Sequence, residues 1–304
     1  MKNKKKILIV GCGNMGTAHL TSFLKAKSSY HITVVDKDFT INKLKKKFSD
    51  SFVEFQNKLP KKKSFDLVII ATGSKERFLV SNMIIKNNSI KIILLEKFIF
   101  LKKIDYIKFD TLLNSQKIKC YVNCWGTTLY RLLKFPKMIN KKTTINVTIK
   151  KGNYLTTLIH ILNLIFDAIG LKKFNNYNFT IDKVFKSKVK GYDEILGKLS
   201  FNTKDNYTDI NILSKKMKDT FKIEVKDRMK SVIYLNKFKL IKKHNNKLEK
   251  FDFPLSSVFT EKMYQNINNV RYPYKFINYK YAKDLSLLIL NLFLKKSIKN
   301  ISIR

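Results

Sequence analysis

A glycine-rich turn near the start of the chain constrains the fold more than any other feature of the sequence. Four apolar residues at 7–10 run directly into GCGNMG, which has the spacing G-x-G-x-x-G. In such a turn the first glycine permits a tight bend, the second lets the backbone approach a diphosphate, and the third permits close packing of strand and helix. The turn therefore predicts a buried strand followed by a helix whose free N–H groups bind phosphate. The predicted cofactor-binding residues here are Gly11, Gly13, Asn14, Met15 and Gly16.

An acidic residue stands at the expected distance beyond this turn. The apolar run 32–35 ends at Asp36, 20 residues after Gly16. A carboxylate at the tip of a second strand accepts both hydroxyl groups of an adenosine ribose and repels a 2′-phosphate. The alternative interpretation is an aspartate that only caps a turn or a helix. Together the two signals predict NAD as the cofactor, and Lys37 leaves NADP open.

Alternating strands and helices account for the first 122 residues. Buried parallel strands are predicted at 7–10, 32–35, 67–71, 90–95 and 118–122. Helices are predicted at 15–27, 40–48, 76–87 and 102–115. This order predicts an α/β domain over residues 1–122, with a doubly wound parallel sheet of the Rossmann type that binds NAD(P).

The pattern changes from residue 123 onwards. A short helix at 127–134 and a strand at 143–150 precede a long apolar helix that ends at Gly170. Further strands are predicted at 179–186, 195–203, 207–213, 219–226, 230–235 and 238–243, and helices at 256–269 and 277–295. Strands joined by short polar turns indicate an open, mainly antiparallel sheet. The second domain, 123–304, is thus predicted to be α+β and to serve substrate binding or homo-oligomer formation.

The formal charge of +40 suggests nucleic-acid binding at first sight. However, 57 of the 62 basic residues are lysine, and they are spread along the whole chain. Arginine is the better residue for bidentate contacts with phosphates and bases. We therefore expect no specific nucleic-acid partner, although the charge should favour anionic ligands.

The cysteines and the apolar runs indicate a cytoplasmic protein. Cys12, Cys120 and Cys124 have no spacing typical of a metal site, so no metal is predicted. Unpaired cysteines are typical of reducing compartments. The lysine-rich start precedes too few apolar residues for a secretory signal, and the run 285–294 is too short to span a bilayer.

Six segments, in this order, also carry a family resemblance. They are GCGNMGTAHL at 11–20, IIATGSKERF at 69–78, LLEKFIF at 94–100, YVNC at 121–124, LIHILNL at 158–164 and KGYDEILG at 190–197. On these segments the chain resembles the Gfo/Idh/MocA oxidoreductases, and among them the short members associated with cell-surface and nucleotide-sugar metabolism. The resemblance implies hydride transfer between NAD(P) and a secondary alcohol of a sugar or nucleotide sugar.

The resemblance also implies two catalytic residues. Lys97 follows a buried strand, where an ammonium group can hydrogen-bond the reacting oxygen and stabilise charge on it. Glu96 beside it pairs with Lys97 or orients it. His160, on the long helix of the second domain, matches the family position for proton transfer with the hydroxyl group. Alternatively, Lys97 is a surface residue and His160 a hydrogen-bonded core residue.

The chain also departs from the family pattern. Phe98 replaces a proline common after the E-K pair, and no arginine follows Asn123, where relatives often have one shortly afterwards. Asn163 replaces an acid three residues after the histidine, and Thr156 and Thr157 replace other polar partners. An asparagine can orient a hydroxyl group but cannot share a proton. These departures support a second hypothesis, a nicotinamide-nucleotide-binding protein that has lost catalysis.

Further candidates surround these residues. Thr72 and Gly73 are predicted beneath the cofactor, and Arg77 opens the next helix, where it could reach a phosphate or a substrate. The predicted substrate residues are Arg77, Asn123, Trp125, Thr156 and Asn163. Packing explains Trp125 better than sugar stacking does. His19, on the first helix, is expected to pack or to cap rather than to take part in chemistry.

Overall fold

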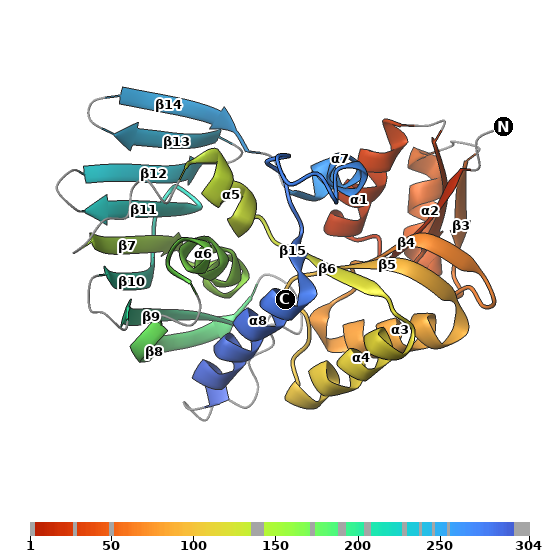
Figure 1. Cartoon of the computed structure of the whole chain (residues 1–304), viewed down its shortest axis with the longest axis horizontal. Coiled ribbons are helices and arrows are strands. Elements are labelled where there is room, and N and C mark those ends of the chain that lie inside the picture. The colour runs from red at the N-terminus through yellow and green to blue at the C-terminus, as the bar shows by residue number, and fades with distance from the viewer. Residues whose placement is uncertain are drawn as a thin grey trace. The chain divides into compact units, whose positions relative to one another are not determined.

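The computed structural model describes residues 4–26, 29–48, 52–134, 143–170, 174–187, 193–203, 208–226, 230–236, 239–244, 247–253 and 256–294. The chain forms two compact units, each with its own sheet (Figure 1). The first unit comprises Met1–Cys124 and Ser256–Leu287, and the second comprises Trp125–Leu255 and Leu288–Arg304. The fold class predicted from the sequence is confirmed, with a parallel sheet in the first unit and a mainly antiparallel sheet in the second.

The sheet of the first unit has the strand order β15-β6-β5-β4-β1-β2-β3 among the described residues. Its strands are β1 (Lys5–Val10), β2 (Tyr30–Val35), β3 (Val53–Gln56), β4 (Ser64–Ile70), β5 (Ser89–Glu96), β6 (Lys119–Asn123) and β15 (Ile277–Asn278). All pairs are parallel except β15 with β6. The strand order reverses at β1, which places the glycine turn at the switch point where ligands of such sheets bind.

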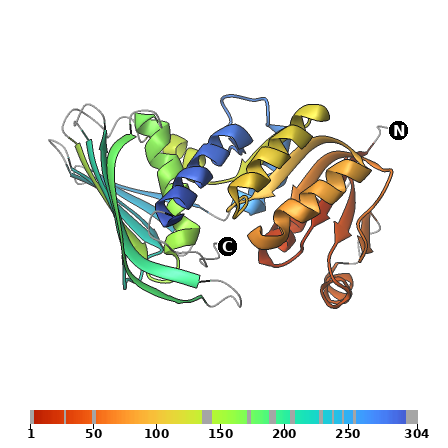
Figure 2. The same ribbon diagram turned by 90° about the horizontal axis from the view of Figure 1, so that it is seen from below.

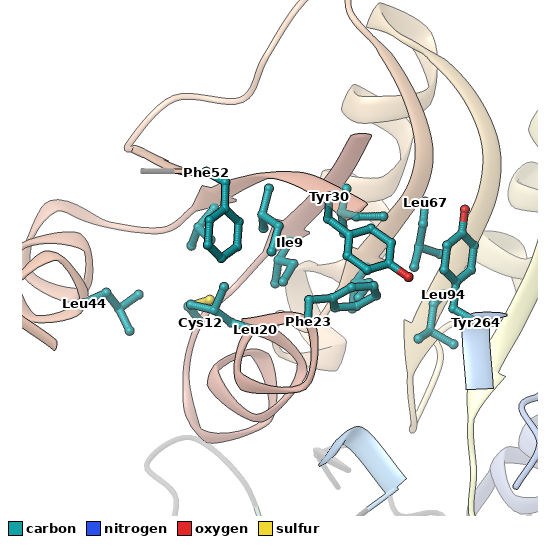
Figure 3. Close-up of a cluster of buried hydrophobic side chains, with 14 of the residues drawn as sticks. Ile9, Cys12, Leu20, Phe23, Tyr30, Leu44, Phe52, Leu67, Leu94 and Tyr264 are labelled. Carbon is teal, nitrogen blue, oxygen red and sulfur yellow. The ribbon is translucent and has the colours of Figure 1, made fainter. Parts of the chain in front are cut away.

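Helices cover both faces of this sheet. They are α1 (Asn14–Leu24), α2 (Asp38–Lys47), α3 (Ser74–Asn87) and α4 (Lys103–Ser115). On one face, Leu20 and Phe23 of α1 and Leu44 of α2 pack in a buried cluster with Ile9 and Leu67 (Figure 3). The helices α3 and α4 lie side by side on the other face (Figures 1 and 2). Burial on both faces explains why the strands are apolar throughout instead of alternating.

A segment from the end of the chain also belongs to the first unit. It contains the short helix η4 (Ser256–Phe259), α7 (Thr260–Gln265), β15 and the start of α8 (Tyr279–Leu294). Tyr30 donates a hydrogen bond to Glu261 Oε1 at 2.9 Å, and the Glu261 N–H donates to Ser22 Oγ at 3.0 Å. The predicted boundary after residue 122 placed this segment in the second domain, and polar bonds to α1 and β2 place it in the first unit instead.

The second unit is built on a sheet with the strand order β14-β13-β12-β11-β7-β10-β9-β8 in the described part. Its strands are β7 (Thr143–Lys150), β8 (Phe174–Lys186), β9 (Asp193–Thr203), β10 (Thr208–Lys215), β11 (Phe221–Lys226), β12 (Lys230–Asn236), β13 (Lys239–His244) and β14 (Lys247–Asp252). Among the described strands of this sheet, only β7 and β10 pair in parallel. The helices α5 (Gly126–Leu132) and α6 (Tyr154–Ile169) lie on one face of this sheet (Figure 2).

Among the described residues, no helix combines the length and the apolar character needed to cross a membrane.

Candidate functional site

The structure explains each glycine of the GCGNMG turn separately. Gly11 has φ +85°, and a Cβ atom there would lie 2.7 Å from the backbone nitrogen of Thr72. A Cβ on Gly16 would lie 1.9 Å from the carbonyl oxygen of Gly11. By contrast, a Cβ on Gly13 would have no atom within 4 Å. Packing therefore requires the first and third glycines, whereas the second faces open space that a ligand could enter.

The first turn of α1 presents its N–H groups beside this open space. Gly13 is the N-cap residue, no side chain caps the helix, and no acidic residue lies in its first turn. Asn14 is exposed and Met15 half-buried. Uncapped N–H groups and the positive end of the helix dipole suit an anion such as a diphosphate.

Asp36 lies directly against the glycine turn. Its Oδ2 accepts the backbone N–H of Cys12 at 2.5 Å, and its Oδ1 accepts the N–H of Lys37 at 2.7 Å. The bond to Lys37 is a local turn contact, as the alternative interpretation expected, whereas the bond to Cys12 joins the tip of β2 to the glycine turn. Each carboxylate oxygen can accept a further hydrogen bond. The carboxylate is thus positioned to bind hydroxyl groups next to the turn.

A pocket of about 420 Å³ opens beside this turn. Its lining residues are Cys12, Gly13, Asn14, Thr17, Phe39, Thr40, Lys43, Leu44 and Lys47. Lys43 and Lys47 lie one helical turn apart on α2, so their ammonium groups give the pocket a positive lining. Phe39 is 83% exposed. Sequence reasoning missed these three residues, although lysines four apart and an apolar residue on a polar helix were the available signals.

A second group of site residues lies where β5 and β6 end. Lys97 follows β5 and is half-buried, and the peptide bond between Lys97 and Phe98 is cis. Glu96 is 3% exposed and accepts hydrogen bonds from His19 Nε2 at 2.9 Å and Asn123 Nδ2 at 2.6 Å. Burial alone would raise the pKa of the Glu96 carboxyl, but the hydrogen bond and charge of His19, the charge of Lys97 and the Asn123 bond together hold that pKa below its usual range.

His19 packs inside the first unit, as the sequence suggested, and its ring also forms a distant polar contact. Its imidazole is completely buried and bonds Glu96, the residue that precedes Lys97. A histidine on the first helix gave no sign of this contact, because the two residues are 77 positions apart.

Arg77 does not face a ligand, which corrects the prediction that it reaches a phosphate or substrate. The guanidinium is buried and donates hydrogen bonds to the carbonyl oxygens of Thr72, Glu96, Phe98 and Ile99. It therefore ties the turn at Thr72 and Gly73 to the segment around Lys97. Thr72 and Gly73 themselves are half-buried, and Gly73 is the N-cap residue of α3.

In the second unit, His160 is 3% exposed and stacks on Trp125. Their ring centroids are 4.3 Å apart with an interplanar angle of 21°, and Trp125 stacks in turn on Phe221 at 5.5 Å. The backbone N–H of Trp125 donates to His160 Nδ1 at 3.3 Å. The indole thus packs among aromatic rings, as the sequence suggested.

Asn163 holds the start of α5 by hydrogen bonds to Thr127. Its Oδ1 accepts the backbone N–H of Thr127 at 2.7 Å, and its Nδ2 donates to Thr127 Oγ1 at 3.1 Å. A Cβ on Gly126 would lie 2.4 Å from Asn163 Oδ1 and from the carbonyl oxygen of His160. The glycine therefore permits close packing of α5 on α6. Thr156 Oγ1 donates to the carbonyl oxygen of Asn153 at 3.2 Å, within the first turn of α6.

The thiols offer no nucleophile in this site. Cys12, Cys120 and Cys124 are buried and form no disulfide. Burial, followed by the nearby charge of Asp36, raises the pKa of Cys12 to about 12, so its thiol stays protonated near neutral pH. Among the described residues, no cluster of three or more metal-ligating side chains occurs.

The fold and the turn together define an α/β protein with a Rossmann-type nucleotide-binding unit. A family model described as shikimate/quinate 5-dehydrogenase matches residues 1–96, less than a third of the chain. The comparison with curated proteins gives no match.

Solved structures match over nearly the full length, at low sequence identity. A super-repressor mutant of Gal80p from Saccharomyces cerevisiae has a TM-score of 0.74 and 11% identity, covering 97% of this chain and 96% of that chain. An oxidoreductase from Bacillus cereus has a TM-score of 0.70 and 13% identity, with coverage of 96% and 97%. Biliverdin reductase from Synechocystis, in complex with biliverdin and NADP⁺, has a TM-score of 0.68 and 11% identity, with coverage of 95% and 98%. These similarities establish the fold.

Proposed function

We propose that the protein is an NAD(P)-dependent oxidoreductase of the Gfo/Idh/MocA type, acting on a secondary alcohol of a sugar or nucleotide sugar. The observation that carries this proposal is the glycine turn, with Asp36 bonded to it and the uncapped N-terminus of α1 beside it. The open space at Gly13 fits a diphosphate, and the Asp36 carboxylate fits a ribose. The oxidoreductases among the fold relatives support the same class.

The cofactor would be NAD, with NADP still open. Asp36 favours the unphosphorylated ribose, because a carboxylate repels a 2′-phosphate. Lys43 and Lys47 in the adjacent pocket favour NADP instead, since their ammonium groups attract a 2′-phosphate. When bound, the nicotinamide supplies the chemistry of hydride exchange with the substrate carbon.

Two residues of this chain would serve that exchange. The Lys97 ammonium would hold the reacting oxygen and stabilise the charge that develops on it. His160 would exchange the hydroxyl proton at Nε2, and for this Nδ1 has to carry the ring proton and release the N–H of Trp125. A homo-oligomer formed through the sheet of the second unit, and a location in the cytoplasm, complete this proposal.

A second candidate is a nicotinamide-nucleotide-binding protein without catalysis. It is favoured by the surroundings of His160, which is buried against Trp125. An imidazolium carries a proton on both nitrogens, and a proton on Nδ1 would face the N–H of Trp125. Asn163, engaged by Thr127, could not replace it. One of the fold relatives is described as the transcriptional regulator Gal80p, from a Kluyveromyces yeast, so this fold is not confined to enzymes.

The test has two stages. Mass measurement of the purified native protein, followed by titration with NADH and NADPH, should detect a bound dinucleotide. A screen of sugars and nucleotide sugars should then produce a change in nicotinamide absorbance. Binding without turnover on any of them would support the second candidate, and absence of binding would contradict both.

A further inference from the structure

A chain of buried hydrogen bonds runs from the returning C-terminal segment to the end of β6. Its members are Thr260, His19, Glu96 and Asn123, and none is more than 3% exposed. His19 Nδ1 lies 2.5 Å from Thr260 Oγ1, His19 Nε2 lies 2.9 Å from Glu96 Oε1, and Asn123 Nδ2 lies 2.6 Å from the same oxygen. All four belong to the first unit.

The direction of each bond follows from the end at Thr260. The Thr260 hydroxyl donates its only proton to the carbonyl oxygen of Ser257, at 2.9 Å. It must therefore accept from His19, which puts a proton on Nδ1. The other nitrogen faces Glu96 Oε1, which also accepts from Asn123. One further proton is shared between His19 and Glu96.

That shared proton belongs on His19. The surroundings hold the pKa of Glu96 below its usual range, because the His19 and Asn123 bonds and the nearby positive charges outweigh the effect of burial. Glu96 is therefore a carboxylate, and its Oε1 accepts the N–H of His19 Nε2. Hydrogen bonds from His19 and Asn123 offset the cost of burying this carboxylate.

The carboxylate in turn fixes the amide of Asn123. A carboxylate accepts and does not donate, so the Nδ2 group of Asn123 must face it. The amide oxygen, Oδ1, then points away from Glu96. In the described part of the chain this Oδ1 is buried and has no hydrogen-bond partner. Native proteins rarely leave a buried acceptor unsatisfied, so a donor from a ligand or a water is expected there.

We propose that His19, held by Thr260, is a positioning residue that turns the Asn123 amide oxygen toward the donor N–H of the nicotinamide carboxamide. The proposal rests on the proposed function, since it presumes a nicotinamide cofactor. It is motivated by the position of Asn123 at the carboxyl end of β6, next to the strand end that carries Lys97, where ligands of doubly wound sheets bind.

The charge state of His19 is testable without any cofactor. The chain has four histidines, and long-range proton–nitrogen NMR spectra report which ring nitrogens carry protons. The His31→Asn and His244→Asn variants help to assign the signals. Near neutral pH, we expect His19 to show protons on both nitrogens. A His19 signal in which one ring nitrogen carries no proton would overturn the proposal, whether or not the protein binds a dinucleotide.

The role of Asn123 is tested with a cofactor analogue. In acetylpyridine adenine dinucleotide a methyl group replaces the amide NH₂, so the ring lacks the donor. The wild-type protein should bind NAD about tenfold more tightly than the analogue, the difference expected for one hydrogen bond to a buried acceptor. Asn123→Leu should remove this preference. Equal binding of NAD and the analogue by wild type would overturn the proposal.

Matched variants of His19 separate positioning from general structural damage. His19→Gln keeps a donor near the position of Nε2 and should retain the preference for NAD, whereas His19→Asn is too short to reach Glu96 and should lose it. His31→Asn is the control. The His31 side chain is half exposed, and its Nε2 lies 3.8 Å from Glu54 Oε2, too far for a hydrogen bond. Loss of the preference for NAD in the control variant, or retention of that preference in His19→Asn, would contradict the role of His19.

If wild type binds neither dinucleotide, the proposed function fails and the NMR result alone decides the charge state.

Discussion

At the scale of single residues, the three glycines of one motif have different physical tasks. Gly11 and Gly16 are required by the close approach of backbone atoms, and Gly13 leaves space for a ligand. The spacing of the motif predicted all three, because the motif itself encodes these tasks. By contrast, the sequence could not reveal that Arg77 is buried among carbonyl oxygens, since an arginine that opens a helix is equally compatible with a phosphate site.

The glycines can be separated by substitution with alanine. Gly16→Ala should destabilise the fold by about 1–3 kcal/mol or more, because its Cβ would overlap the Gly11 carbonyl. Gly13→Ala should leave stability nearly unchanged and weaken dinucleotide binding. Urea unfolding and a binding titration of both variants measure the two effects. The reverse order of stabilities would contradict the structure of the turn.

Asp36 should set the cofactor preference. Asp36→Ala removes the acceptor for the ribose and the partner of the Cys12 N–H, so NAD should bind about tenfold more weakly. The affinity for NADP should fall less, so the difference between the affinities for NAD and NADP should become smaller. Asp38→Ala, at the exposed start of α2, is the control. Tighter binding of NADP than of NAD by the wild type would show that Lys43 and Lys47 prevail and that the assigned role of Asp36 is wrong.

At the scale of elements, most strands and helices follow from apolar patterning. The predicted helix at 76–87 and strand at 143–150 correspond to α3 and β7 almost residue for residue. The strands β3, β14 and β15 were not predicted, because they are short or only partly buried and so lack an apolar pattern. Gly126, one of the residues that follow Asn123 where relatives often have an arginine, is explained by the packing of α5 on α6.

Gly126→Ala should therefore damage the second unit. The added Cβ would overlap Asn163 Oδ1 and the His160 carbonyl, both at 2.4 Å. We expect a loss of about 1–3 kcal/mol in the free energy of unfolding. Combining it with Asn163→Ala should recover only part of that loss, because the backbone overlap persists. Chemical denaturation of the single and double variants provides the measurement, and an unchanged stability in Gly126→Ala would refute the close packing.

Glu194 on β9 gives the second unit a dependence on pH. Burial raises the pKa of its carboxyl from 4.5 to about 7, and backbone hydrogen bonds such as that from the Leu155 N–H at 3.3 Å oppose this only in part. Because the folded state holds the proton more tightly than the unfolded state, the stabilisation is full below pH 4.5 and is lost as the pH rises to about 7.

Glu194→Gln should remove this dependence. As the pH rises from 4.5 to about 7, the free energy of unfolding of the variant should increase relative to that of wild type, by at most about 3 kcal/mol. Above that range the difference between the two proteins should stay constant. Glu249→Gln, at a half-exposed side chain on β14, serves as the control. A difference between Glu194→Gln and wild type that does not change with pH would mean that Glu194 titrates at its ordinary pKa.

At the scale of the whole molecule, one feature of chain organisation escaped sequence reasoning. The segment 256–287 returns to the first unit and contributes Thr260 and Glu261 to buried polar contacts with α1 and β2. Composition does not change on entering this segment, so nothing in the sequence marks it as part of another unit. The hydrogen bond between Glu96 and His19 could not be predicted from the sequence either, since it joins two elements that lie far apart in the chain.

The catalytic proposal assigns one proton transfer to Lys97 and His160. Lys97→Met keeps the bulk of the side chain but removes its charge, so turnover should fall by about a hundredfold or more with NAD affinity little changed. His160→Ala should also reduce turnover and remove a limb near neutral pH from the rate profile. The losses should be well short of additive in the double variant, because both residues serve one proton transfer. Full additivity, or no effect of His160→Ala, would favour the non-catalytic candidate.

The most direct test of the central claim is a crystal structure of the protein grown with saturating NAD. We predict the diphosphate on the N–H groups at the start of α1, the adenosine ribose on Asp36, and the nicotinamide next to Lys97. A dinucleotide bound away from the GCGNMG turn, or none at saturating concentration, would contradict the account.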